Sequence, residues 1–172
     1  MRQANPTVNF GLGNPLAIVG AAGAERASLL KFDLSLLPAT PLPTLVVLSI
    51  YCSVYASALV PNVYRVFRVW VEDQATWNVY STGNNWGTAG CKNTTTDRSS
   101  TSMGSATIAA GWVNFTLGLT EFASLRASNN GMIIMDASGT AGTNLFYARD
   151  AADPANAPKL TVTLPGGQIL IF

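Results

Sequence analysis

The sequence predicts an all-β fold, a β-sandwich of two sheets arranged as a jelly roll. β-Branched and aromatic residues come in short runs of strand length, and Gly, Pro, Asn and Ser separate these runs. Helical patterns are nearly absent. The number of runs suits the eight strands of a jelly roll. A chain of 172 residues suits one domain, which at this size buries roughly 70% of its unfolded surface.

The expected strands follow one another along the whole chain. They cover residues 16–19, 27–33, 44–54, 62–70, 111–117, 131–136, 144–149 and 159–164. One short helix is expected over residues 120–127, with the hydroxyl of Thr120 as its N-terminal cap. Residues 34–43 contain three prolines and are expected to form a crossover loop, because proline has no N–H for a strand ladder. Residues 81–105 form a long polar excursion, of a length that is usually functional or disordered.

Four short patterns recur in a fixed order along the chain. They are Asn9-Phe10-Gly11, Leu29-Leu30-Lys31-Phe32-Asp33-Leu34, Trp70-Val71-Glu72 with Ala75-Thr76-Trp77, and Pro158-Lys159-Leu160. In order and spacing they resemble the DNRLRE family of secreted and surface β-sandwiches, from about Pro6 to Leu164. The resemblance implies a domain that attaches to surfaces, a first strand that is shortened or missing, and a structural role for Glu72 in ordering its loop. It also implies that Trp70 and Trp77 pack beneath that loop.

The chain continues past the last strand that the resemblance covers. We therefore divide it into a sandwich domain, residues 1–164, and an extension, residues 165–172. After a Pro-Gly-Gly turn the extension ends in an uncharged strand of candidate interface residues: Gln168, Ile169, Leu170, Ile171 and Phe172. An exposed apolar strand is an aggregation hazard, so we expect it to be covered. It could fold back onto its own sheet, add to or swap into the sheet of a neighbouring subunit, or plug into another protein.

The composition disfavours several classes of partner. Only 11% of the residues are charged, against about 25% in ordinary globular proteins, and the net charge is +1. Nucleic-acid binders need clustered Lys and Arg, so no nucleic-acid partner is expected. The longest apolar run, residues 45–60, is shorter than the roughly 20 residues of a membrane span, and the N-terminus lacks the apolar core of a signal peptide. Low charge favours dense packing against other proteins, because few ions are desolvated.

The titratable residues do not form a catalytic pattern. There is no histidine, so an imidazole base and histidine metal ligands are excluded. We expect no catalytic residues, no cofactor and no metal site. Asp150, Asp153 and Asn156 could hold calcium, although Asx turns use the same residues more often. Cys52 and Cys91 are either one disulfide or two free thiols.

Trp86 lies between Asn85 and Gly87 in the polar excursion. An exposed tryptophan here could stack on a sugar ring or anchor a protein interface, and the alternative is local packing. Trp86, Asn84 and Asn85 are therefore candidate ligand or interface residues.

Two classes of function remain, and neither is enzymatic. The first is a structural protein of a phage virion surface, such as a capsid decoration (cement) protein. Its partners would be the major capsid protein or another virion protein, and other copies of itself, a trimer being the expected form. The second is a carbohydrate-binding module or an adhesive domain in an extracellular or cell-surface setting, with a glycan as its ligand.

Overall fold

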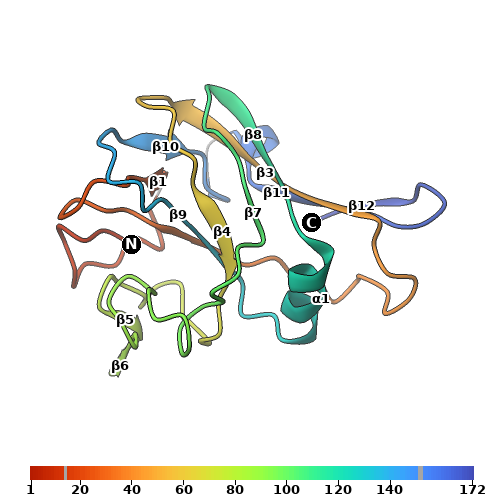
Figure 1. Ribbon diagram of the computed structural model, residues 1–172, viewed down its shortest axis with the longest axis horizontal. Coiled ribbons are helices and arrows are strands. Elements are labelled where there is room, and N and C mark those ends of the chain that lie inside the picture. The colour runs from red at the N-terminus through yellow and green to blue at the C-terminus, as the bar shows by residue number, and fades with distance from the viewer. Residues whose placement is uncertain (14, 151–152) are drawn as a thin grey trace.

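The computed structural model describes residues 1–13, 15–150 and 153–172, and its body is formed by two antiparallel sheets (Figure 1). The larger sheet runs in the order β1 (Leu16–Ile18), β10 (Asn144–Phe146), β3 (Leu45–Val54), β11 (Lys159–Thr163) and β12 (Ile169–Ile171), and β8 (Gly111–Thr116) also pairs with β3. The smaller sheet runs β2 (Ser28–Leu30), β9 (Met132–Met135), β4 (Asn62–Arg65) and β7 (Gly104–Ser105). The predicted all-β sandwich is confirmed.

Strand β3 is the centre of the larger sheet. Its first half pairs with β11, from Leu45 opposite Thr163 to Ser49 opposite Lys159, and its second half pairs with β10. Its other edge pairs with β8, up to Cys52 opposite Gly111. The ten residues of β3 are therefore hydrogen-bonded to three other strands. The predicted crossover, residues 34–43, carries the chain from β2 in the smaller sheet to β3 in the larger.

The main core lies between the two sheets. Alternate residues of β3 point into it, so Val46, Leu48 and Ile50 are buried while their neighbours are half-buried or exposed. Strands β8 and β11 alternate in the same way and bury Phe115 and Leu160. Because side chains alternate along a strand, those of the intervening residues lie on the outer side of the larger sheet.

The smaller sheet is covered on both sides. Met132 and Ile134 of β9 belong to the main core, whereas Ile133 belongs to a second cluster with Trp86 and Cys91. Both of the latter come from the polar excursion, which carries the short hairpin of β5 (Val79–Ser81) and β6 (Asn84–Asn85). The excursion is thus a third layer over the smaller sheet.

Several expected boundaries differ from the structure, because the strands expected over residues 27–33 and 144–149 cover only Ser28–Leu30 and Asn144–Phe146. The strand expected over residues 62–70 ends at Arg65. The amide of Val66 still bonds to the Gly131 carbonyl at 3.0 Å, but Gly131 has a φ of 82° and lies before the first residue of β9, so the ladder does not continue. The helix, α1 (Leu119–Ala127), has Gly118 at its N-cap without a side-chain bond. Thr120 lies inside the helix, so the expected capping role was wrong.

The C-terminal extension folds back on its own sheet. Strand β12 pairs antiparallel with β11, with Leu170 opposite Val162, after a turn at Gly166 and Gly167 whose residues have positive φ angles. In Figure 1 the β11–β12 hairpin reaches out from the body of the sandwich. A single-turn helix, η1 (Pro154–Asn156), precedes β11.

Candidate functional site

No segment among the described residues forms a layer over the outer side of the larger sheet. We call this side the outer face and define it by the outward residues of four strands: Leu45, Val47, Ser49, Tyr51 and Ser53 of β3, Trp112, Asn114 and Thr116 of β8, Lys159, Thr161 and Thr163 of β11, and Ile169 and Ile171 of β12. Of these residues only Lys159 is charged. Solvated sheet faces normally carry alternating polar and charged residues, so this composition indicates a surface that packs against something.

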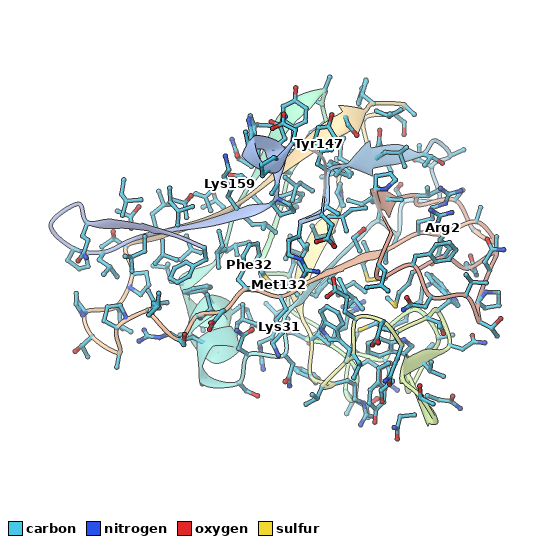
Figure 2. The ribbon with its side chains drawn as sticks, turned by 180° about the vertical axis from the view of Figure 1, so that it is seen from behind. Arg2, Lys31, Phe32, Met132, Tyr147 and Lys159 are labelled. Carbon is cyan, nitrogen blue, oxygen red and sulfur yellow. The ribbon has the colours of Figure 1, made fainter. Side chains whose placement is uncertain are left out.

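Aromatic side chains gather at one end of the outer face. The rings of Tyr51 and Trp112 meet edge to face with centroids 5.4 Å apart, and Tyr147 stacks on Tyr51 at 5.6 Å. The ammonium of Lys159 lies 4.5 Å from the centroid of a Trp112 ring, and Tyr147 and Lys159 lie at the same end in Figure 2. Trp112 is 39% exposed, so this cluster is accessible. The sequence analysis missed it, although the alternation of Trp112 with buried Val113 was a usable signal.

The opposite end of the outer face contains part of the predicted interface segment. The β12 alternation divides that segment, because Ile169 and Ile171 are 58% and 66% exposed while Leu170 and Phe172 pack against the main core. Leu45, Thr163 and Ile169 lie in one row across three strands. The exposed isoleucines therefore extend the outer face, without adding a charge, to the edge of the sheet.

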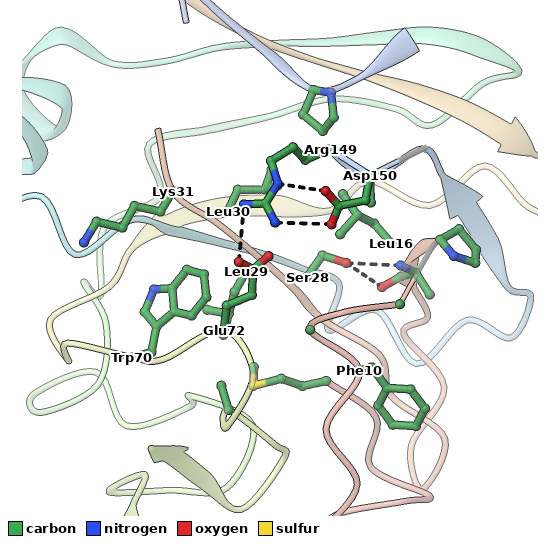
Figure 3. Close-up of a pocket in the computed structure, with 18 of the residues that line it drawn as sticks. Phe10, Leu16, Ser28, Leu29, Leu30, Lys31, Trp70, Glu72, Arg149 and Asp150 are labelled. Carbon is green, nitrogen blue, oxygen red and sulfur yellow. Dashed lines mark hydrogen bonds and ion pairs between the residues drawn. The ribbon is translucent and has the colours of Figure 1, made fainter. Parts of the chain in front are cut away.

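A second feature is a groove of about 510 Å³ that runs between the edges of the two sheets, which we call the edge groove (Figure 3). All four sequence patterns contribute to its lining, represented by Phe10, Leu30, Trp70 and Pro158. Lys31 and Phe32 also line it (Figure 2), and Phe172 brings in the C-terminal extension. Patterns far apart in the sequence thus meet at one place in the fold.

The first and third patterns are joined by Asn9. Its side-chain amide donates to the carbonyl oxygens of Glu72 and Ala75, at 2.8 and 2.7 Å, and its oxygen accepts from the Gly11 amide at 2.9 Å. A Cβ atom on Gly11 would lie 1.8 Å from the Glu72 carbonyl oxygen, so only glycine fits. The main chain of Glu72 is therefore part of a structural staple. Trp77 is buried, and the half-buried Trp70 donates from its indole to the Asn130 carbonyl at 2.7 Å.

The carboxylates of Glu72 and Asp150 at the edge groove both pair with the side chain of Arg149. The guanidinium of Arg149 lies 3.3 Å from Glu72 and makes a two-pronged contact with Asp150 at 3.0 and 3.2 Å (Figure 3). Hydrogen bonding to Arg149 lowers the pKa of Asp150, and the same bond raises the pKa of Arg149. A general acid at neutral pH needs a carboxyl with a raised pKa, whereas the contact with Arg149 lowers the pKa of Asp150.

Trp86 does not reach the surface. It is 4% exposed, its indole donates to the Thr76 carbonyl at 3.0 Å, and its ring lies against Tyr80. Local packing is therefore its observed role, since its ring has no free face for a sugar or a partner. Asn84 and Asn85 of β6 are exposed, whereas the Trp86 indole is buried, so the three residues do not share one surface.

Asp97 organises the polar excursion and was missed by the sequence analysis. Its fully buried carboxylate accepts from the amides of Gly87, Thr88 and Asn93, at 2.7, 3.0 and 3.2 Å. It also lies 3.5 Å from the Arg68 guanidinium. An aspartate in a polar loop is ordinary in sequence, so nothing local distinguished this one.

The remaining expectations concern ions and thiols. Asp153 caps η1 by accepting from Ala155 and from the side chain of Asn156, which is the Asx-turn alternative. Within residues 1–13, 15–150 and 153–172 no group of three acidic, Cys or His side chains is arranged to hold a metal. Cys52 and Cys91 are buried free thiols.

None of the helices among the residues that the structure describes is long and apolar enough to cross a bilayer.

No protein-family model matches the chain, and no curated protein sequence is detectably similar to it.

Proposed function

We propose that this protein is a non-enzymatic structural subunit that binds other proteins through the outer face, as a component of a phage virion surface such as a capsid decoration protein. The observation that carries the proposal is the contrast between the two sheets. The smaller sheet is covered by a third layer, whereas the larger sheet presents a face on which only Lys159 is charged and Ile and Trp side chains are exposed.

The chemistry of the outer face favours a protein partner. The cores of protein interfaces are depleted in charged residues and enriched in Tyr and Trp, as this face is. Hydroxyl side chains such as Thr161 and Thr163 can be covered at little cost when they find hydrogen-bond partners. The virion setting comes from the sequence, where low charge and an apolar terminal strand favoured dense assembly.

The contacts at the edge groove favour a structural role over catalysis. Its two carboxylates are paired with Arg149, and Asn9 uses the Glu72 main chain to hold two loops together. The groove therefore resembles a structural junction. The resemblance to DNRLRE domains, which attach to surfaces, agrees with this proposal.

The proposal requires that a phage genome encodes this sequence, and the test is a footprinting experiment on particles purified from a lysate of that phage. Mass spectrometry first asks whether the protein is in the particles. Hydroxyl-radical labelling then compares bound and free protein at Trp112, with Tyr55 as the matched control because it is 48% exposed but lies beyond the end of β3. We expect Trp112 to be protected in the particle and Tyr55 to be labelled equally in both. Absence from the particles would refute the virion setting, and unprotected Trp112 would refute the outer face as the contact.

Glycan binding is the second candidate, and the exposed aromatic cluster is the observation that favours it. Tyr51 and Tyr147 present phenol rings at the sheet surface, and aromatic rings bind the apolar faces of sugars. Against it, the Lys159 ammonium lies over a Trp112 ring that a sugar would need. A glycan array probed with the wild type and Tyr147→Ala separates the two functions. Binding that is lost in Tyr147→Ala but kept in Tyr55→Ala would favour the glycan.

A further inference from the structure

Strand β12 is an open edge of the larger sheet. It is the last strand in the sheet order, and the Gly166–Gly167 turn before it projects into open space. Natural edge strands are usually protected by charges, prolines or bulges. The segment from Gln168 to Phe172 contains no charged side chain and no proline, and its pairing with β11 has a regular register.

The ladder shows which main-chain groups of β12 are free for another strand. Phe172 exchanges two hydrogen bonds of 3.0 Å with Leu160, and the Gln168 carbonyl accepts from Leu164 at 2.8 Å. Hydrogen-bonded and non-hydrogen-bonded residues alternate in an antiparallel pair. The amide and carbonyl groups of Ile169 and Ile171 therefore point away from β11, along the open edge.

We propose that two copies of this chain associate by antiparallel pairing of their β12 strands, around a two-fold axis at Leu170. In this register Ile169 of one copy faces Ile171 of the second copy, and each such pair exchanges two main-chain hydrogen bonds. The two-fold axis produces this Ile169–Ile171 pair twice, so four main-chain hydrogen bonds join the two copies. The side chains of Ile169 and Ile171 then lie next to each other on the outer face, where apolar cross-strand neighbours stabilise a sheet.

The second copy fits this edge because the segment is complementary to itself. An isologous contact places identical charges near each other, which penalises most charged edges. Here no charged side chain has to be paired or desolvated. The two larger sheets become one continuous sheet, and the two outer faces become one wider face. This arrangement closes with two copies, in contrast to the trimer expected from the sequence.

The pairing involves only a short segment of each chain, so we expect a weak, reversible dimer that forms as the protein concentration rises. A standard stable interface buries roughly 1,600 Å² in total, more than one short strand pair provides. The proposal does not rest on the proposed function, because it concerns the purified protein alone. A failed particle experiment therefore leaves it standing, and the reverse also holds.

The test is sedimentation equilibrium of the wild type and two variants over a wide range of concentrations. Ile169→Pro removes an amide that β11 does not use, and prolines are tolerated at edges with that orientation. Each dimer loses two hydrogen bonds, which corresponds to a dissociation constant raised about 30-fold. Thr161→Lys is the matched control, since it places a charge in the middle of the outer face and leaves the β12 edge intact.

The expected result is a reversible wild-type dimer, a weakened Ile169→Pro dimer and an unchanged Thr161→Lys dimer. A monomeric wild type at every concentration overturns the proposal. So does association that Thr161→Lys abolishes and Ile169→Pro leaves intact, because the outer faces would then pack on each other. Amide hydrogen exchange of the wild type does not depend on how the variants fold. The Ile169 and Ile171 amides should become protected as concentration rises, and constant exchange would count against edge pairing.

Discussion

Replacing Asp97 with asparagine should destabilise the protein more than is usual for an aspartate in a polar loop. The carboxylate is fully buried, and its two oxygens accept from three main-chain amides and from the Thr96 hydroxyl. An asparagine of the same size keeps one acceptor oxygen. Its NH₂ group must then face amides that also donate, whichever way the side chain is turned.

The magnitude follows from these contacts. Breaking a buried ion pair by removing one partner costs about 3–5 kcal/mol, and each buried donor left without an acceptor costs about 1–3 kcal/mol. The Arg68 partner is partly exposed, which places the expected loss at the lower end, about 3–4 kcal/mol. With a urea m-value of about 2 kcal/mol per molar, the unfolding midpoint should fall by about 1.5–2 M.

Urea unfolding of Asp97→Asn, followed by tryptophan fluorescence, measures this loss. Trp86 makes the probe local, because its indole is buried in the layer that Asp97 organises. Asp33→Asn is the matched control, since that carboxylate is exposed and accepts only from Ser35 in its own turn. We expect the control to unfold with the wild type. Equal midpoints for the two variants would refute the role given to Asp97.

Three further predictions concern other buried contacts. Burial raises the pKa of both Cys52 and Cys91, so neither thiol should react with Ellman's reagent at pH 8 until the protein is unfolded, when two thiols should appear. Fewer than two would indicate a disulfide. Gly11→Ala should lower the melting temperature by several degrees, because its Cβ would overlap the Glu72 carbonyl. Ser28→Ala should cost about 1–3 kcal/mol in denaturant unfolding, because the hydroxyl both donates to and accepts from the main chain of β1, whereas a stability like that of the wild type would contradict this.

The strands were predictable because their signals are local. Each of the eight expected segments contains a strand of the structure, and short runs of β-branched and aromatic residues between Gly, Pro, Asn and Ser are enough to find it. The overextended strand at residues 62–70 shows where local signals end. Val66 and Phe67 look like strand residues, but the partner strand β9 begins only at Met132 and the preceding Gly131 has a φ of 82°, which the residues of β4 do not reveal.

The role of the polar excursion was not predictable from its own composition. Polar loops of this length are read as mobile or functional, yet this one buries Trp86 and Cys91 against the smaller sheet. The usable signal lay elsewhere, in the unbroken apolar run of β9, Met132–Met135, which is buried at every position. A strand without alternation requires cover on both faces, and the excursion is the segment that provides it.

The same rule, applied to the larger sheet, gives the argument for the outer face. Strands β3, β8 and β11 alternate, so their sequences require cover on one face only, and the main core supplies it. The residues that alternate with the buried ones are nevertheless not the charged residues that a solvated sheet normally carries, since only Lys159 is charged. The face is therefore apolar enough to be covered and polar enough to remain soluble when free. That balance is typical of surfaces that bind and release protein partners, and it is the reason to look for the partner on the larger sheet.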